Sequence, residues 1–168
     1  MRDPEFVSNI RREYVQLDEM IAESSKMLET LVQMQGPAYE LQYTRWKMFL
    51  CLIKNYDAAG RCCGVRWAKY HFSPKNGKRS WYNGRLPGKI PPSTVRLMSP
   101  AEQERFQEID AVAVELSKLR HSLTSKKKRI FSTFQNIRQT DKRRLQEVTQ
   151  KCQALQGAKT KIEEMEYF

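Results

Sequence analysis

The sequence predicts a mainly α fold, in which long helices form an antiparallel hairpin or coiled-coil bundle with a small basic insertion that is irregular or a β-hairpin. Apolar residues recur at heptad-like spacing on both sides of the middle of the chain, and a complete helix-start signal stands at Ser99. Residues 36–98 hold twelve of the thirty Lys and Arg residues but only Glu40 and Asp57 as acids. This segment therefore carries nearly all of the net charge of +11.

The N-terminal arm is assigned to residues 7–58, because residues 1–6 resemble translated vector sequence and are set aside. Apolar spacings of four and three predict a helix that Gly36 and Pro37 end, since proline lacks an amide donor and restricts the residue before it. A second helix is expected from 38 to about 57, with Phe49 and Leu52 on its apolar face. The assembly seam of the first helix consists of Leu17, Ile21, Leu28 and Leu31.

The C-terminal arm, residues 99–168, begins with Ser99 as N-cap, Pro100 in the first helical position and Glu102 three residues after the cap. Asp141 interrupts the heptad spacing with a stutter. The seam of this arm consists of Ile130, Phe134, Ile137, Leu145, Val148, Leu155 and Ile162. The two arms could pair antiparallel within one chain, or the long C-terminal helix could form a parallel homodimer. We expect a dimer or another coiled-coil partner in either case, because long apolar stripes are usually covered.

The basic head, residues 59–98, has β-forming composition. The turn signal at 74–77 predicts a short hairpin in which residues 78–83 return. Cations alternate with aromatic rings in this segment, a combination that neutralises phosphates and stacks on exposed bases. The predicted phosphate contacts are Arg66, Lys69, Lys78, Arg79 and Arg85, and the predicted stacking residues are Trp81 and Tyr82. A second basic patch consists of Lys126, Lys127, Lys128 and Arg129.

These features predict a non-enzymatic assembly or scaffold module of a larger protein, whose head binds a polyanion, most simply nucleic acid or chromatin. One alternative is a structural module that docks on an acidic protein surface such as a microtubule. Another is capture of methyl-lysine by an aromatic cage of Trp67, Tyr70, Trp81 and Tyr82. A fourth interpretation is that the rings are small-domain core and the cations their solvated rim.

Catalytic chemistry is not indicated by the sequence. The chain has two histidines, seven scattered glycines and no phosphate-binding glycine-rich loop. No cofactor and no metal is expected, because adjacent Cys62 and Cys63 are poor chelating geometry without a fourth ligand at normal spacing. Four cysteines without disulfide-like spacing favour an intracellular location, nuclear or cytoplasmic. No apolar run is long enough for a membrane span, so no membrane partner is expected.

Overall fold

The computed structural model describes residues 4–43, 47–72, 79–81 and 84–166, and for residues 4, 72, 79–81 and 154–166 it describes the backbone alone. The chain divides into two compact units, Met1–Lys126 and Lys127–Phe168. Unit 1 holds the sheet, two helices and the first part of a third, whereas unit 2 is the remainder of that third helix. Each unit is described separately below.

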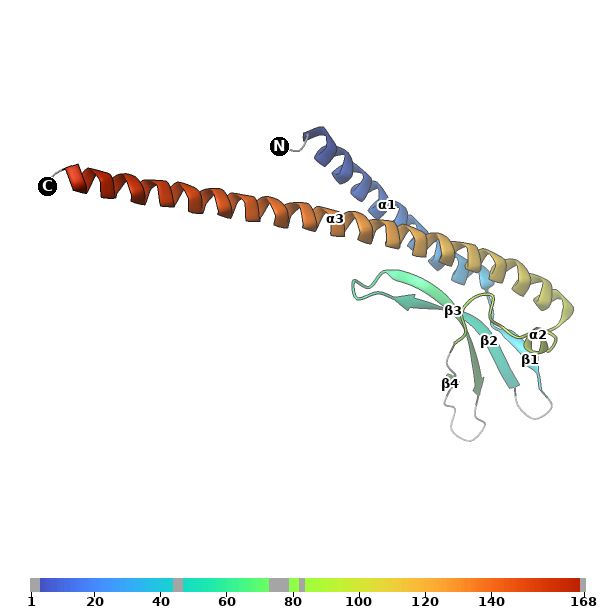
Figure 1. Ribbon diagram of the computed structural model, residues 1–168. Coiled ribbons are helices and arrows are strands. Elements are labelled where there is room, and N and C mark those ends of the chain that lie inside the picture. Colours follow the sequence, from blue (N-terminus) through green and yellow to red (C-terminus); the bar gives the residue numbers. More distant parts are fainter. Residues whose placement is uncertain (1–3, 44–46, 73–78, 82–83, 167–168) are drawn as a thin grey trace. The chain divides into compact units, whose positions relative to one another are not determined.

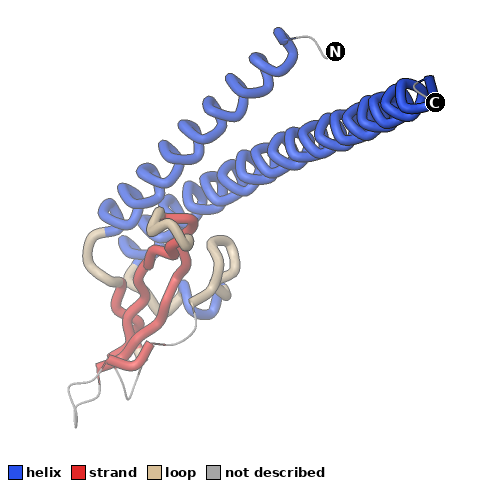
Figure 2. The backbone as a smooth tube through the Cα atoms, turned by 90° about the vertical axis from the view of Figure 1, so that its left-hand side faces the viewer, coloured by secondary structure: helices blue, strands red, loops and turns tan. Residues whose placement is uncertain are grey.

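In the part of the chain that the structure describes, the helices and strands follow one another as a helix, four strands, a short helix and a long helix (Figure 1). They are α1 (Pro4–Gln35), β1 (Tyr39–Gln42), β2 (Lys47–Tyr56), β3 (Cys62–Phe72), β4 (Arg79–Trp81), α2 (Pro92–Val95) and α3 (Pro100–Glu166). The strands form one sheet in the order β1-β2-β3-β4, and each pairs antiparallel with its sequence neighbour. Sheet and helices are coloured separately in Figure 2.

The predicted bundle of long helices is wrong. Residues 39–42 and 47–56, expected within a second helix of the N-terminal arm, form β1 and β2, and β2 pairs with β3 along most of its length. The run 48–53 is apolar throughout, so it shows no periodicity that would distinguish a helix from a strand buried on both faces. Pairing with β3 decides between them, because it satisfies the backbone of both strands. The expected small hairpin insertion is therefore part of a four-stranded sheet that helps to form the core.

One face of the sheet packs against α1 and the first part of α3. Leu50 and Leu52 of β2 and Val65 and Trp67 of β3 point to this core face, because they alternate with residues of the opposite face. The helices contribute Leu28, Leu31, Phe106, Ile109 and Ala113 to the same buried cluster. Trp67 is 1 % exposed, and its indole Nε1 donates a 2.7 Å hydrogen bond to Oδ1 of Asp110 in α3.

Side chains fix the end of α1 and the start of α3. α1 ends at Gln35, and Gly36 follows with a φ of 72°, a conformation that favours glycine. The Oε1 atom of Gln35 accepts a 2.9 Å hydrogen bond from the Leu52 backbone N–H, beyond the end of β1. The predicted capping box is confirmed: Ser99 Oγ donates to Glu102 Oε2 at 2.7 Å, and Glu102 N donates to Ser99 Oγ at 3.4 Å.

The predicted seam residues fall in both units. In unit 1, Leu17, Ile21, Leu28 and Leu31 are buried. In unit 2, Ile130, Phe134 and Ile137 are partly exposed, whereas Leu145 and Val148 are 68 % and 57 % exposed. The side chains of Leu155 and Ile162 lie outside the described residues, as do the predicted turn at 74–77 and residues 1–3.

Two features are absent from the described residues. No helix there combines the length and apolarity needed to cross a membrane. No group of three or more His, Cys, Asp and Glu side chains there is arranged to hold a metal ion.

Candidate nucleic-acid interface

The face of the sheet opposite the core, called here the outer sheet face, carries aromatic and cationic residues. It consists of Lys47, Phe49, Cys51 and Ile53 of β2 and Arg66, Ala68 and Tyr70 of β3. The register sets Phe49 opposite Tyr70, Cys51 opposite Ala68 and Ile53 opposite Arg66. Ala68 is 1 % exposed, but the other six residues are exposed or partly exposed. Solvent therefore reaches rings and cations on this face.

Phe49 and Tyr70 form the aromatic centre of the outer sheet face. Their ring centroids are 5.4 Å apart and their planes differ by 22°, so the rings stack across the two strands. Antiparallel pairing holds both backbones at the register position that brings the rings together. Ordered aromatic rings are the kind of surface on which unpaired bases stack, because every base offers a π face.

Arg66 brings a cation to the same face. It is exposed and lies opposite Ile53. A Cβ atom added to Gly84 would lie 2.8 Å from Arg66 Cδ and 2.8 Å from the Trp67 carbonyl oxygen. Only glycine at 84 thus allows the chain to run beside β3 in contact with the Arg66 stem. At the other end of the face, Lys47 Nζ lies 3.8 Å from Glu40 Oε1, with both side chains largely in solvent.

Lys69, a predicted phosphate contact, points to the core side instead. It lies opposite Leu50, and its Nζ donates a 2.9 Å hydrogen bond to Thr94 Oγ1 in α2. Burial is the main cause that lowers the pKa of Lys69, and repulsion from Arg85 adds to it. Arg85 is exposed and exchanges two backbone hydrogen bonds with Trp67, which puts it on the same side as Lys69. The structure therefore separates Lys69 and Arg85 from Arg66.

The remaining predicted contacts divide between the described and undescribed parts of the chain. Trp81 and Arg79 occupy the register positions opposite Tyr70 and Phe72, and their side chains lie outside the described residues. Lys78 and Tyr82 lie outside the described residues altogether. Lys126 is exposed at the end of unit 1, and in unit 2 Lys127 is partly exposed while Lys128 and Arg129 are exposed.

The methyl-lysine cage does not fit the sheet. Trp67 points to the core face, whereas Tyr70 points to the outer sheet face. Successive residues of a strand point to opposite faces of the sheet, so residues 67 and 70, which are three positions apart, lie on opposite faces. Their two rings cannot line one pocket.

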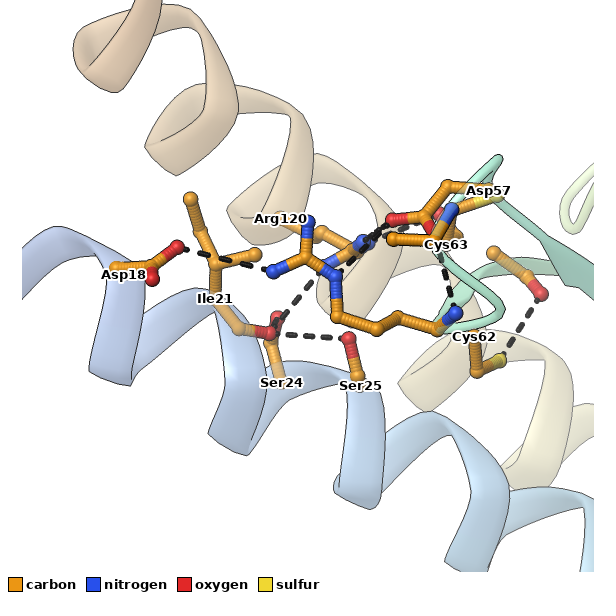
Figure 3. Close-up of polar contacts among 11 residues, drawn as sticks. Asp18, Ile21, Ser24, Ser25, Asp57, Cys62, Cys63 and Arg120 are labelled. Atoms are coloured by element: carbon orange, nitrogen blue, oxygen red, sulfur yellow. Dashed lines mark hydrogen bonds and ion pairs between the residues drawn. The ribbon is translucent and has the colours of Figure 1, made fainter.

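A buried arginine fixes the turn between β2 and β3 against both helices (Figure 3). Arg120 of α3 donates from Nε to the Cys63 carbonyl oxygen at 3.0 Å and from Nη1 to the Ile21 carbonyl oxygen at 3.2 Å. Its Nη2 lies 3.9 Å from Oδ2 of Asp57, which also accepts a 3.3 Å hydrogen bond from Arg61 Nε. The guanidinium is thus occupied in holding the hairpin, and it is not available to a ligand.

Two important positions were missed by reasoning from the sequence. The sequence pattern puts Phe49 on the apolar face of an expected helix and therefore does not predict its pairing with Tyr70. Asp110 was not singled out, yet it accepts hydrogen bonds from the Trp67 indole and from the Gly88 backbone N–H. A weak signal existed for Phe49, since a six-residue apolar run is of strand length. Nothing local in the sequence marks Asp110.

Comparison with known proteins found no matching family model, no matching curated protein and no matching solved structure.

Proposed function

We propose that this chain is a non-enzymatic nucleic-acid-binding module and that the outer sheet face contacts single-stranded nucleic acid. The observation that carries the proposal is the stacked pair of Phe49 and Tyr70 beside the exposed Arg66 on a face that the core does not use. Stacking rings beside cations are the combination by which proteins hold unpaired bases and their phosphates.

The charge distribution supports the same proposal. Residues 36–98, which contain the sheet, carry twelve Lys and Arg residues against two acids. The helical segment 1–35 carries seven acids against four Lys and Arg residues. A polyanion is therefore attracted to the sheet and repelled from α1, and its binding should weaken steeply as salt is raised.

The proposal is tested by fluorescence anisotropy with labelled single-stranded and double-stranded oligonucleotides. Phe49→Leu and Tyr70→Leu keep apolar volume in the sheet but remove the π faces. Each change is expected to weaken single-strand binding by about tenfold, because stacking contributes about 1–3 kcal/mol per base. Tyr56→Leu is the matched control, since Tyr56 is 57 % exposed and lies at the irregular end of β2.

The cationic part of the interface is tested in the same assay. Arg66→Gln is expected to weaken binding and reduce its salt dependence by about one counterion. Lys89→Gln removes the same charge from an exposed loop position and should have a smaller effect. Thermal unfolding of every variant separates lost binding from lost folding. The proposal would be overturned if Arg66→Gln and Lys89→Gln weakened binding equally and if neither Phe49→Leu nor Tyr70→Leu changed it.

Docking on an acidic protein surface such as a microtubule is the second candidate. The exposed cations of unit 2, including Lys128, Arg129, Arg143 and Arg144, favour it. Such docking is driven by charge, so it should depend on salt but not on Phe49 or Tyr70. Microtubule sedimentation with the two ring variants therefore distinguishes the two functions.

A further inference from the structure

Two exposed cations stand toward opposite ends of the outer sheet face. Lys47 is the first residue of β2, and Arg66 of β3 lies opposite Ile53, in the second half of β2. Ile53 comes six residues after Lys47. At a rise of about 3.3 Å per residue, the backbone positions of the two cations are therefore about 20 Å apart along the strands.

The stacked rings lie between these cations and nearer to Lys47. Phe49 is two residues from Lys47 on β2, which corresponds to about 7 Å. Tyr70 is four residues from Arg66 on β3, which corresponds to about 13 Å. A cation, a pair of stacked rings and a second cation thus follow one another in the direction of the strands. A nucleic acid that contacts all three must run along β2 and β3.

An acid flanks this path on β1. In the strands that the structure describes, Glu40 is the only Asp or Glu residue. It lies opposite Phe49, and its Oε1 is 3.8 Å from Lys47 Nζ, with half of the Glu40 side chain exposed. A phosphate at Lys47 has to compete with this carboxylate, which also repels any phosphate that crosses the sheet onto β1. Glu40 therefore favours a path along the strands over one that continues across β1.

We propose that a single strand lies along β2 and β3 with phosphates at Lys47 and Arg66 and a base on Phe49 and Tyr70, and that Glu40 limits the path on the side of β1. This inference rests on the function proposed above and defines its ligand more closely. The ligand is an unpaired stretch of about four to six nucleotides, since stacked nucleotides rise about 3.4 Å each and an extended strand spans more per nucleotide.

The length of the path is tested by competition, in which 5′-phosphorylated oligothymidylates of two to twelve nucleotides displace a labelled twelve-nucleotide strand. Affinity is expected to rise steeply up to about six nucleotides and only slightly beyond. Lys47→Gln should weaken binding at every length. Arg66→Gln should weaken the six-nucleotide ligand by about two- to fivefold, the usual effect of one exposed charge pair. It should leave the dinucleotide unchanged, because a dinucleotide on the rings does not reach Arg66.

The role of Glu40 is tested by a change of opposite sign. Glu40→Gln is expected to strengthen binding of the six-nucleotide ligand by about two- to fivefold. Glu104→Gln is the matched control, because it removes the same charge from an exposed position on α3 and should have a smaller effect. The gain from Glu40→Gln should shrink when Lys47→Gln is present in the same chain. Thermal unfolding of every variant shows whether it remains folded.

The outcomes separate this inference from the proposed function on which it rests. If binding depends on Phe49 and Tyr70 but Arg66→Gln weakens two- and six-nucleotide ligands equally, the path along the strands is overturned and the proposed function stands. The same holds if Glu40→Gln and Glu104→Gln have equal effects. Binding that does not change in Phe49→Leu or Tyr70→Leu overturns both.

Discussion

Among the described residues, the hydroxyl of Tyr39 is buried without a hydrogen-bond partner. The ring packs in the core with its centroid 6.0 Å from that of Trp67, and burial raises the pKa of the phenol. A buried hydroxyl that makes no hydrogen bond loses its interaction with water on folding and regains nothing. The ring of Tyr39 therefore stabilises the core, whereas its hydroxyl opposes folding.

Replacing Tyr39 with Phe should leave the free energy of unfolding unchanged or raise it by up to about 1 kcal/mol. Tyr39→Ala, which also removes the ring, should lower it by about 3–5 kcal/mol. Urea denaturation measures both changes. A loss of stability in Tyr39→Phe would contradict this prediction, because it would mean that the hydroxyl is hydrogen-bonded in solution.

Asp57 controls the turn between β2 and β3. The Arg61 backbone N–H is the main cause that lowers the pKa of Asp57; burial opposes it, and the Ala59 N–H and the Arg61 guanidinium lower it further. Because the folded-state pKa lies below the ordinary value of about 4, the ionised carboxylate stabilises the fold above that pH. This contribution is lost as the pH falls through the folded-state pKa.

The corresponding prediction concerns Asp57→Asn, which keeps an acceptor for the two backbone N–H groups but removes the charge. The variant should be less stable than the original chain at neutral pH, and the difference should shrink as the pH falls below about 4. Urea denaturation across a pH series measures it. A difference that does not change with pH would contradict an electrostatic role for this carboxylate.

At the scale of elements, the start of α3 also fastens the first strand of the sheet. Glu102 Oε2 accepts from the Ser99 backbone N–H at 3.0 Å, and Glu102 Oε1 accepts from the Glu40 backbone N–H at 3.2 Å. Burial raises the pKa of Glu102, but the hydrogen bonds from Ser99 and Glu40 together lower it by more. One carboxylate thus caps a helix and connects it to β1.

Ser99→Ala should lower the free energy of unfolding by about 1 kcal/mol, the usual cost of losing an N-cap side chain. Glu102→Ala should cost more than that, because the Glu40 N–H in β1 also loses its acceptor. Glu104→Ala, an exposed glutamate in the same turn of α3, is the control and should have little effect. Thermal unfolding ranks the three variants. Equal effects of Glu102→Ala and Glu104→Ala would show that the cap is not formed.

The sequence specified helix boundaries better than strands. The start of α3 has a local signal in Ser99, Pro100 and Glu102. The end of α1 has one in Gly36, which follows the helix with a positive φ. Residues 47–56 have no such local signal, because their strand state depends on pairing with a segment that is distant in sequence. Arg66 can be predicted as a contact because the segment around it combines cations with aromatic rings. The placement of Arg66 and Lys69 on opposite faces of the sheet cannot be predicted in this way, because it depends on which residues of the strand face the core.

At the scale of the whole molecule, charge is segregated by structural element. The sheet-containing segment 36–98 is strongly basic, residues 1–35 are acidic overall, and residues 127–153 are again basic. Oppositely charged surfaces within one chain give different ligands different places to bind. On the proposed function, a polyanion is therefore expected at the outer sheet face and not at α1.

Photocrosslinking identifies the residues that contact a bound oligonucleotide. A single-stranded oligonucleotide that contains 5-bromouridine is bound at low salt and irradiated, and the crosslinked peptides are identified by mass spectrometry. Crosslinks are expected at Phe49 and Tyr70. They should disappear in Phe49→Leu and Tyr70→Leu, whereas Tyr56→Leu should leave them in place. Crosslinks confined to residues 127–153, or the same crosslinked peptides in both ring variants, would contradict the claim that the outer sheet face binds nucleic acid.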